Sequence, residues 1–216
     1  MSPEQQFWWN WWVNLGVAIG TLLAVLVALF GDRFRANFFP PRLKIKLLET
    51  GGEKTILTHS NAGVMEHVDD VRYFHLQVWN ERRWSAANGV QVFLTRLDEP
   101  GPNNQLQVAW VGNVPLRWRD QEVVPLTQTI GAAKDCDFCM VGRKDGLSLM
   151  PLILPNNLSA HRQGKCRFVA RLQARSNEAD SEVMRIEVAW DGVWEDSDTE
   201  MRRHLVVSEL GSEHVK

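Results

Sequence analysis

An unbroken run of uncharged residues from Phe7 to Phe30 constrains this chain more than any other feature. The run contains no Lys, Arg, Asp or Glu and reads FWWNWWVNLGVAIGTLLAVLVALF. As a helix it would be about 36 Å long, whereas a bilayer core of about 30 Å needs only about 20 residues. The sequence therefore predicts one membrane-spanning helix over residues 7–30, after a short extracytoplasmic tail at 1–6. A secretory signal peptide fits less well, because residues 1–6 carry no Lys or Arg and no small-residue cleavage motif follows.

The two flanks of this run predict its orientation. The amino end is rich in tryptophan, which favours the lipid headgroup layer, and the other flank is basic, which favours the cytoplasm. We therefore expect an inner-membrane protein with its amino terminus outside and a cytoplasmic domain at 42–216, joined by a basic juxtamembrane linker at 31–41. Pro40 and Pro41 should end the helix. The residues expected at the bilayer interface are Trp8, Trp9, Trp11, Trp12, Arg33, Arg35, Phe38 and Phe39.

Small residues recur along the apolar run at a spacing of four. Gly16, Gly20 and Ala24 would lie on one face of a helix, where a small-residue ridge allows a second helix to approach closely. This spacing predicts a homo-oligomer formed through the helix. The alternative stays open that Gly and Ala are simply common in membrane helices.

Beyond residue 42 the apolar residues alternate with polar ones at a period of two, which is typical of half-buried strands. Examples are the runs at 43–47, 74–78, 90–94, 166–172 and 184–190, and shorter candidates lie near 106–111, 114–118, 123–130, 136–142, 147–153 and 203–209. Turn signals separate these runs. The pattern predicts a mainly β domain, an antiparallel immunoglobulin-like β-sandwich, with a small β-barrel as the alternative.

Two of these runs predict a hairpin with a specific register. Segments 165–174 and 182–190 are joined by the short polar sequence RSNEADS. Their apolar residues match in more than one register, so we use the pairing of charged residues to predict the register. Placing Arg171 opposite Glu187 pairs opposite charges, whereas a shift of two would oppose Arg171 to Arg185, which is unfavourable. We therefore expect Arg171 to face Glu187.

Three stretches carry a resemblance to known proteins: GDRFRANFFPPRLKI, FHLQVWNERRWSAANGVQVFL and RIEVAWDGVWEDSDTEMRRHLVV. With these the chain resembles bacterial single-pass membrane proteins that have an immunoglobulin-like β-sandwich after the membrane helix. The resemblance implies an architecture and no reaction. A looser analogy exists to bacterial antiphage membrane effectors, in which a small β-barrel binds a cyclic nucleotide and membrane helices disrupt the bilayer.

Charge and motifs argue against several function classes. After residue 46 the chain has 19 basic and 24 acidic side chains, a net charge of −5, so no nucleic acid is expected as a partner. The sequence contains no GxSxG, P-loop, GxGxxG or HExxH motif. We therefore expect no catalytic residues and no cofactor.

The three cysteines and an acidic segment are the residues that most resemble metal-binding motifs. Cys136 and Cys139 have CxxC spacing, but an offset of three would place them on opposite faces of a strand. With only Cys166 remaining, the sequence predicts three free thiols and no metal. The acidic segment WDGVWEDSDTE at 190–200 lacks the spacing of a calcium loop and is expected to be a solvated connection.

Two basic-aromatic turns remain as candidate partner contacts: Arg82, Arg83 and Trp84, and Arg117, Trp118 and Arg119. Together these features predict a membrane-anchored interaction or sensing module that recognises a protein partner through loops and sheet edges and has no catalytic activity. The alternative is a ligand-gated membrane effector whose β domain binds a small signal and whose helix oligomerises.

Overall fold

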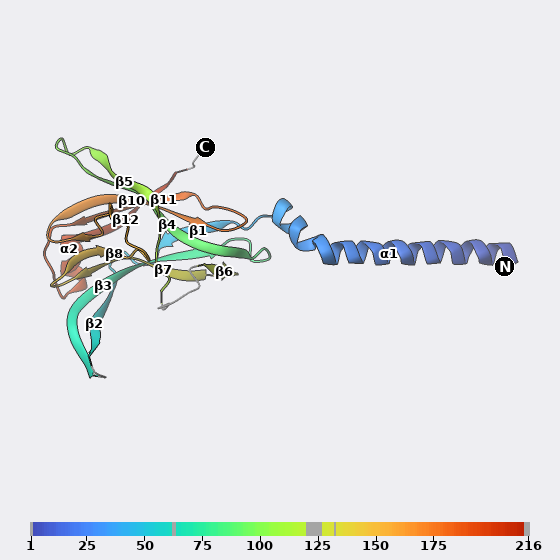
Figure 1. Ribbon diagram of the computed structural model, residues 1–216, viewed down its shortest axis with the longest axis horizontal. Coiled ribbons are helices and arrows are strands. Elements are labelled where there is room, and N and C mark those ends of the chain that lie inside the picture. Colours follow the sequence, from blue (N-terminus) through green and yellow to red (C-terminus); the bar gives the residue numbers. More distant parts are fainter. Residues whose placement is uncertain (1, 62–63, 120–126, 132, 214–216) are drawn as a thin grey trace. The chain divides into compact units, whose positions relative to one another are not determined.

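A computed structural model describes residues 2–61, 64–119, 127–131 and 133–213 (Figure 1). The chain divides into two compact units, Met1–Pro40 and Pro41–Lys216. The first unit is a helix and the second is mainly β, as the sequence predicts.

The first unit contains helix α1, Pro3–Phe38. Its segment Pro3–Gly31 has a mean hydropathy of 2.4 and buries none of its surface against the protein, so the helix is long and apolar enough to cross a membrane. The helix ends two residues before Pro40. Since a proline offers no backbone N–H and disfavours helical geometry in the residue before it, this end follows from the sequence. Most of the predicted linker at 31–41 is therefore helical.

The second unit consists of two antiparallel six-stranded sheets. The first sheet has the strand order β1–β3–β7–β8–β9, with β2 also paired to β3. Its strands are β1 (Leu43–Leu47), β2 (Glu53–Asn61), β3 (Val64–Asn80), β7 (Ala133–Gly142), β8 (Gly146–Leu149) and β9 (His161–Arg162).

The second sheet has the strand order β12–β11–β10–β4–β5, with β6 also paired to β4. Its strands are β4 (Ala87–Pro100), β5 (Leu106–Pro115), β6 (Gln128–Ile130), β10 (Cys166–Arg175), β11 (Val183–Trp190) and β12 (Leu205–Glu213). A short helix, α2 (Asp198–His204), precedes β12.

The alternating apolar residues form one core shared by both sheets. Phe74, Leu76 and Val78 of β3 are almost fully buried, and so are Phe168 and Leu172 of β10. All belong to a single hydrophobic cluster. The described strands form two packed sheets rather than one closed barrel. In the second sheet, the spatial order β11–β10–β4 matches the G–F–C order of an immunoglobulin fold. In the first sheet, β7 and β8 occupy the places of strands E and D. There β7 comes before β8 in the chain, whereas D comes before E in an immunoglobulin fold.

Strands β10 and β11 form the predicted hairpin, but the predicted register is wrong. Arg171 lies opposite Arg185, and Glu187 lies opposite Val169. These two strands alone do not decide the register. In the sheet, β4 lies on the other side of β10 and places Asp98 beside Arg171, with 3.3 Å between Arg171 Nε and Asp98 Oδ2. Glu187 instead accepts a hydrogen bond from Arg167 at 2.7 Å.

The acidic segment at 190–200 is more than a solvated connection. It holds the basic side chains of the first sheet: Arg72 donates to Asp198 at 2.6 Å, and Arg143 and Lys54 both pair with Asp196. The guanidinium of Arg72 also lies 5.7 Å from the ring centre of Trp194. The hydrogen bond from Arg72 holds the pKa of Asp198 below its usual value. We call this group of contacts around the buried Arg72 the Arg72 clamp.

Candidate functional site

The outer face of the second sheet carries a row of arginines, which we call the arginine face. On β10, Arg167, Arg171 and Arg175 alternate with the buried residues of the same strand, so all three point away from the core. On the neighbouring strands, Arg96 of β4 and Arg185 of β11 both lie directly opposite Arg171. Three guanidinium groups therefore lie in a line across three adjacent strands.

A single buried carboxylate stabilises the centre of this row. Asp98 is 4% exposed and accepts hydrogen bonds from Arg96 Nε at 2.6 Å and from Arg171 Nε at 3.3 Å. Like charges directly opposed across strands are unfavourable, so Asp98 offsets part of the repulsion. Burying Asp98 in turn requires these charged partners.

The arginine face gathers basic side chains within an acidic domain. Its arginines form ion pairs with Asp98, Glu187 and Asp180. The side chains of Arg96 and Arg167 are 35% and 47% exposed. The sequence could have predicted part of this face, since positions 167, 171 and 175 lie on one side of a strand. Placing Arg96 and Arg185 beside them required the order of the strands in the sheet.

An apolar strand edge borders the arginine face. Strand β5 pairs with β4 and is an end strand in the sheet order. Its residues Leu106, Val108 and Val111 are 42%, 51% and 63% exposed. They lie opposite Pro100, Asp98 and Arg96, so they share the outer face of the sheet. Val108 and Val111 are three residues apart, but the extra residue Ala109 at a register shift places both on this face. An end strand with exposed apolar residues is a template for pairing with another chain.

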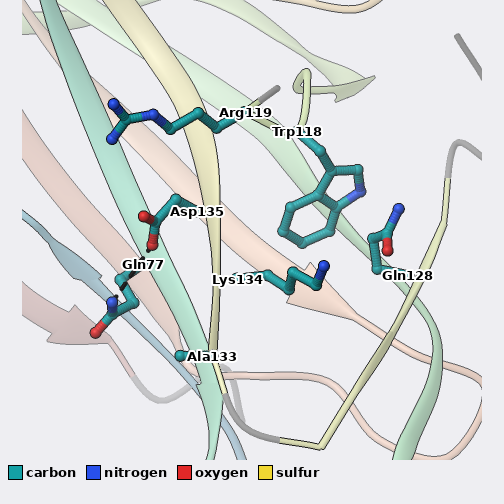
Figure 2. A pocket seen from close by; sticks show the side chains of 7 residues that line it. All are labelled: Gln77, Trp118, Arg119, Gln128, Ala133, Lys134 and Asp135. Atoms are coloured by element: carbon teal, nitrogen blue, oxygen red, sulfur yellow. Dashed lines mark hydrogen bonds between the residues drawn. The ribbon is translucent and has the colours of Figure 1, made fainter. Parts of the chain in front are cut away.

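A polar surface cavity of about 410 Å³ is lined by residues of β3 and β7 in the first sheet and by Gln128 of β6 in the second (Figure 2). The indole of Trp118 lines it together with the amine of Lys134 and the amide of Gln128. The side-chain nitrogen of Gln128 is buried and has no hydrogen-bond partner among the described residues. The remaining lining residues are Gln77, Arg119, Ala133 and Asp135, and Gln77 donates to Asp135 at 3.3 Å.

A chain of ionisable groups continues from this cavity along the first sheet. Arg119 donates to both carboxylate oxygens of Glu53, at 2.8 and 2.7 Å. Glu53 lies 3.6 Å from Nε2 of His75, and Nδ1 of the same ring lies 2.9 Å from Asp137. Tyr73 stacks on His75. Burial, and then the negative charge of Asp137, raise the pKa of Tyr73. The charges are paired with one another, which is typical of a structural network.

The two basic-aromatic turns differ in exposure. Trp84 is 64% exposed and Arg83 is also exposed, so this turn presents both side chains to solvent. Trp118 is only 4% exposed, because residues 116–118 continue the first sheet along β7 through the bridge between Trp118 and Cys136. Its ring belongs to the hydrophobic cluster and also borders the cavity, so in this turn the side chain of Arg117 is exposed and that of Arg119 is half-buried.

The predicted membrane residues all belong to α1, apart from Phe39, which directly follows it. Trp8, Trp11 and Trp12 pack edge to face with ring centres 4.8–6.1 Å apart, and Trp9 is 63% exposed. Gly16, Gly20 and Ala24 are exposed along the helix. The side chains of Arg33, Arg35 and Phe38 lie outside the described part of the chain.

All three cysteines are free, but the opposite-face argument for two of them is wrong. Cys136 lies opposite Leu76 and Cys139 opposite Phe74, and both partners point into the core. A bulge between these pairs adds one residue to β7, so both thiols share the inner face. Burial raises the pKa of all three thiols. None is therefore placed as a reactive thiolate.

Thiol titration checks this arrangement. In the native protein we expect at most Cys166 to react with an aromatic disulfide reagent, because Cys136 and Cys139 are 0% exposed. After denaturation without reductant, all three should react. Rapid modification of two or three thiols in the folded protein would contradict the packing of β7, and one equivalent of zinc would contradict the free thiols.

Other chemistry-bearing groups are dispersed. Ser148 Oγ lies 2.8 Å from Nδ1 of His161, but His161 is exposed and no carboxylate orients its ring in the described residues. A search of the described residues finds no group of three or more His, Cys, Asp or Glu side chains that could hold a metal ion.

Comparison with models of known protein families finds no match to this chain. A search among curated proteins likewise finds no relative.

Proposed function

We propose that this protein is a membrane-anchored recognition module that holds a partner protein at the cytoplasmic side of a bacterial inner membrane, without catalytic activity of its own. Helix α1 is the anchor, and the arginine face with the β5 edge is the binding surface. For the domain we propose an immunoglobulin-like sandwich, supported by the strand order β11–β10–β4, with the order of β7 and β8 reversed.

The arginine face carries this proposal. Five arginines on one sheet face, in a unit with a net charge of −5 after residue 46, favour a partner segment rich in Asp and Glu. The β5 edge beside it offers backbone groups to an extended strand, and Leu106, Val108 and Val111 offer apolar contacts. The partner is thus an acidic segment that adds a strand to β5 and lays its carboxylates over the arginines.

Site-specific photo-crosslinking tests this surface in native membranes. A photoreactive residue at Val111 should capture one protein, and the crosslinked peptide should be acidic. Replacing Arg171 and Arg185 together by Gln should reduce the yield about tenfold, since truncating charged partners at an interface costs on the order of 1–2 kcal/mol. Arg203→Gln is the matched control, because this side chain is 69% exposed on α2.

Two outcomes would count against the arginine face. One is a crosslinking yield that is the same for the double variant and for Arg203→Gln. The other is capture at a control position on the first sheet, such as Asp145, in place of capture at Val111. Asp145 is exposed in the turn between β7 and β8.

The cavity at Trp118 favours a second candidate function, a ligand-gated membrane effector. Its indole, its lysine amine and the amide nitrogen of Gln128, which has no partner in the part of the chain that the structure describes, suit a small planar molecule with a negative charge. In this alternative the ligand binds the β domain and α1 oligomerises through Gly16, Gly20 and Ala24.

The two functions are separable by experiment. Cyclic and linear nucleotides should raise the melting temperature of the wild type but not of Lys134→Glu, and should release dye from proteoliposomes, if the effector function holds. The recognition function predicts that neither signal responds to nucleotides and that crosslinking at Val111 is the same in Lys134→Glu.

A further inference from the structure

The turn between β3 and β4 lies at the point where the β domain joins its membrane anchor. The backbone N–H of Arg42 donates to the side-chain oxygen of Asn80 at 3.0 Å, and the N–H of Glu81 donates to the carbonyl of Arg42 at 3.0 Å. Arg42 is the second residue of the β unit, and only Phe39, Pro40 and Pro41 separate it from α1.

The structure holds this turn rigidly while exposing its tip. Asn80 is 2% exposed; its amide donates to the carbonyl of Ser85, and its oxygen accepts from the N–H of Arg82. Ser85 is also buried. Between them, Arg83 and Trp84 project into solvent, and Trp84 is 64% exposed. A large aromatic ring held on a fixed, exposed turn has the geometry of an interfacial anchor.

The charges around the turn suit an anionic surface. Arg42 pairs with Glu81 at 3.3 Å and Lys44 pairs with Glu182 at 3.3 Å, so the charges of these two acids are balanced. Arg83 has no ion pair within the described residues. Glu178 accepts hydrogen bonds from Asn88 near the start of β4. Its negative charge would be repelled by an anionic surface, which restricts contact with that surface to the tip of the turn.

The length of the tether allows the turn to reach the lipid. With the apolar span ending at Gly31, the helical residues to Phe38 add about 10 Å and the next four residues at most about 14 Å. The headgroup layer itself is about 5–8 Å thick on each side. The chain therefore keeps Arg42, and the turn bonded to it, close to the bilayer surface.

We infer that the turn at Arg83 and Trp84 is a second membrane contact, which docks the β domain on anionic lipid headgroups. Trp84 enters the headgroup layer and Arg83 binds lipid phosphate. This contact sets the orientation of the domain at the membrane. It rests on the anchoring helix of the proposed function but not on the arginine face or its partner.

The test uses the full-length protein in lipid nanodiscs. An environment-sensitive fluorophore is attached at Ala86→Cys in a Cys166→Ser background, because Cys136 and Cys139 are buried and should not react. Nitroxide-labelled lipid headgroups should quench this label in phosphatidylcholine discs that contain phosphatidylglycerol. A label at Asp145→Cys, in the β7–β8 turn, should stay unquenched, because this turn follows the pairing of Gly142 with Val71, nine residues along β3 from Asn80.

Variants identify the side chains responsible. Arg83→Ser should lower the ratio of docked to undocked domain about fivefold, the effect of one basic side chain at an anionic surface. Trp84→Ser should lower it as well, and the double variant should abolish quenching. Lys165→Ser with Val193→Ser is the matched control, since it removes an exposed basic and an exposed apolar side chain elsewhere and should change nothing.

The outcomes separate this contact from the anchor itself. Quenching at Ala86 that survives the double variant, or that is absent in anionic discs, would overturn the inference while the protein remains in the disc. Loss of the protein from the disc fraction would instead refute the anchoring helix. Melting curves of the variants should match the wild type, because Asn80 and Ser85, which hold the turn, are unchanged.

Discussion

Replacing Arg72 by alanine should lower the free energy of unfolding of the β domain by about 3 kcal/mol. Arg72 is 0% exposed and is the largest fully buried side chain of the domain. It donates to Asp198 and to the carbonyl of Asp196, and it packs against Trp194. Alanine would leave a cavity beneath Trp194 and detach the segment before α2 from the first sheet. Urea titration of the detergent-solubilised protein measures the change.

Arg143→Ala is the control for this experiment. Arg143 contacts the same ring, with 5.9 Å to its centre, and pairs with Asp70 and Asp196, but its side chain is 43% exposed. Solvent screens such pairs, so we expect a loss below about 1 kcal/mol. Equal losses for the two variants would show that the Arg72 clamp stabilises the domain no more than an ordinary surface ion pair.

A reporter fused after Lys216 should be fully active if it works only in the cytoplasm and silent if it requires export. The residues that follow the apolar span include five basic side chains, and residues 1–6 include none. Basic residues within about 15–20 positions of a span decide its orientation, and acids such as Asp32 contribute little. The effect is close to all-or-none, because each molecule adopts one orientation.

Neutralising the basic cluster checks the cause of this orientation. Changing Arg33, Arg35, Arg42, Lys44 and Lys46 together to neutral residues should weaken the cytoplasmic signal and produce exported molecules. A matched variant that neutralises five basic residues of the β domain far from the span should keep the wild-type signal. Activity of an export-dependent reporter in the wild type would reverse the proposed topology, and with it the proposed cytoplasmic partner.

The sequence by itself determined the helix and the division of side chains between core and surface. A long run of uncharged and mostly apolar residues favours a buried or membrane-spanning helix, and none of the segment Pro3–Gly31 is buried within the protein. Alternation at a period of two assigns residues such as Leu76 and Ile186 to an inner face whatever the neighbouring strands are, and both are 0% exposed. Strand β2 was missed, because its residues EKTILTHSN alternate only weakly.

Only the tertiary structure decided which side chains meet. The register of Arg171 depended on Asp98 of a third strand, which no pairwise comparison of β10 and β11 includes. The shared face of Cys136 and Cys139 depended on a bulge, which shifts the alternation by one residue. Asp196 and Asp198 accept hydrogen bonds from Arg72, which lies more than 120 residues earlier in the chain. Periodicity is a local property of the chain, whereas ion pairs and register are set by whichever strands the fold brings side by side.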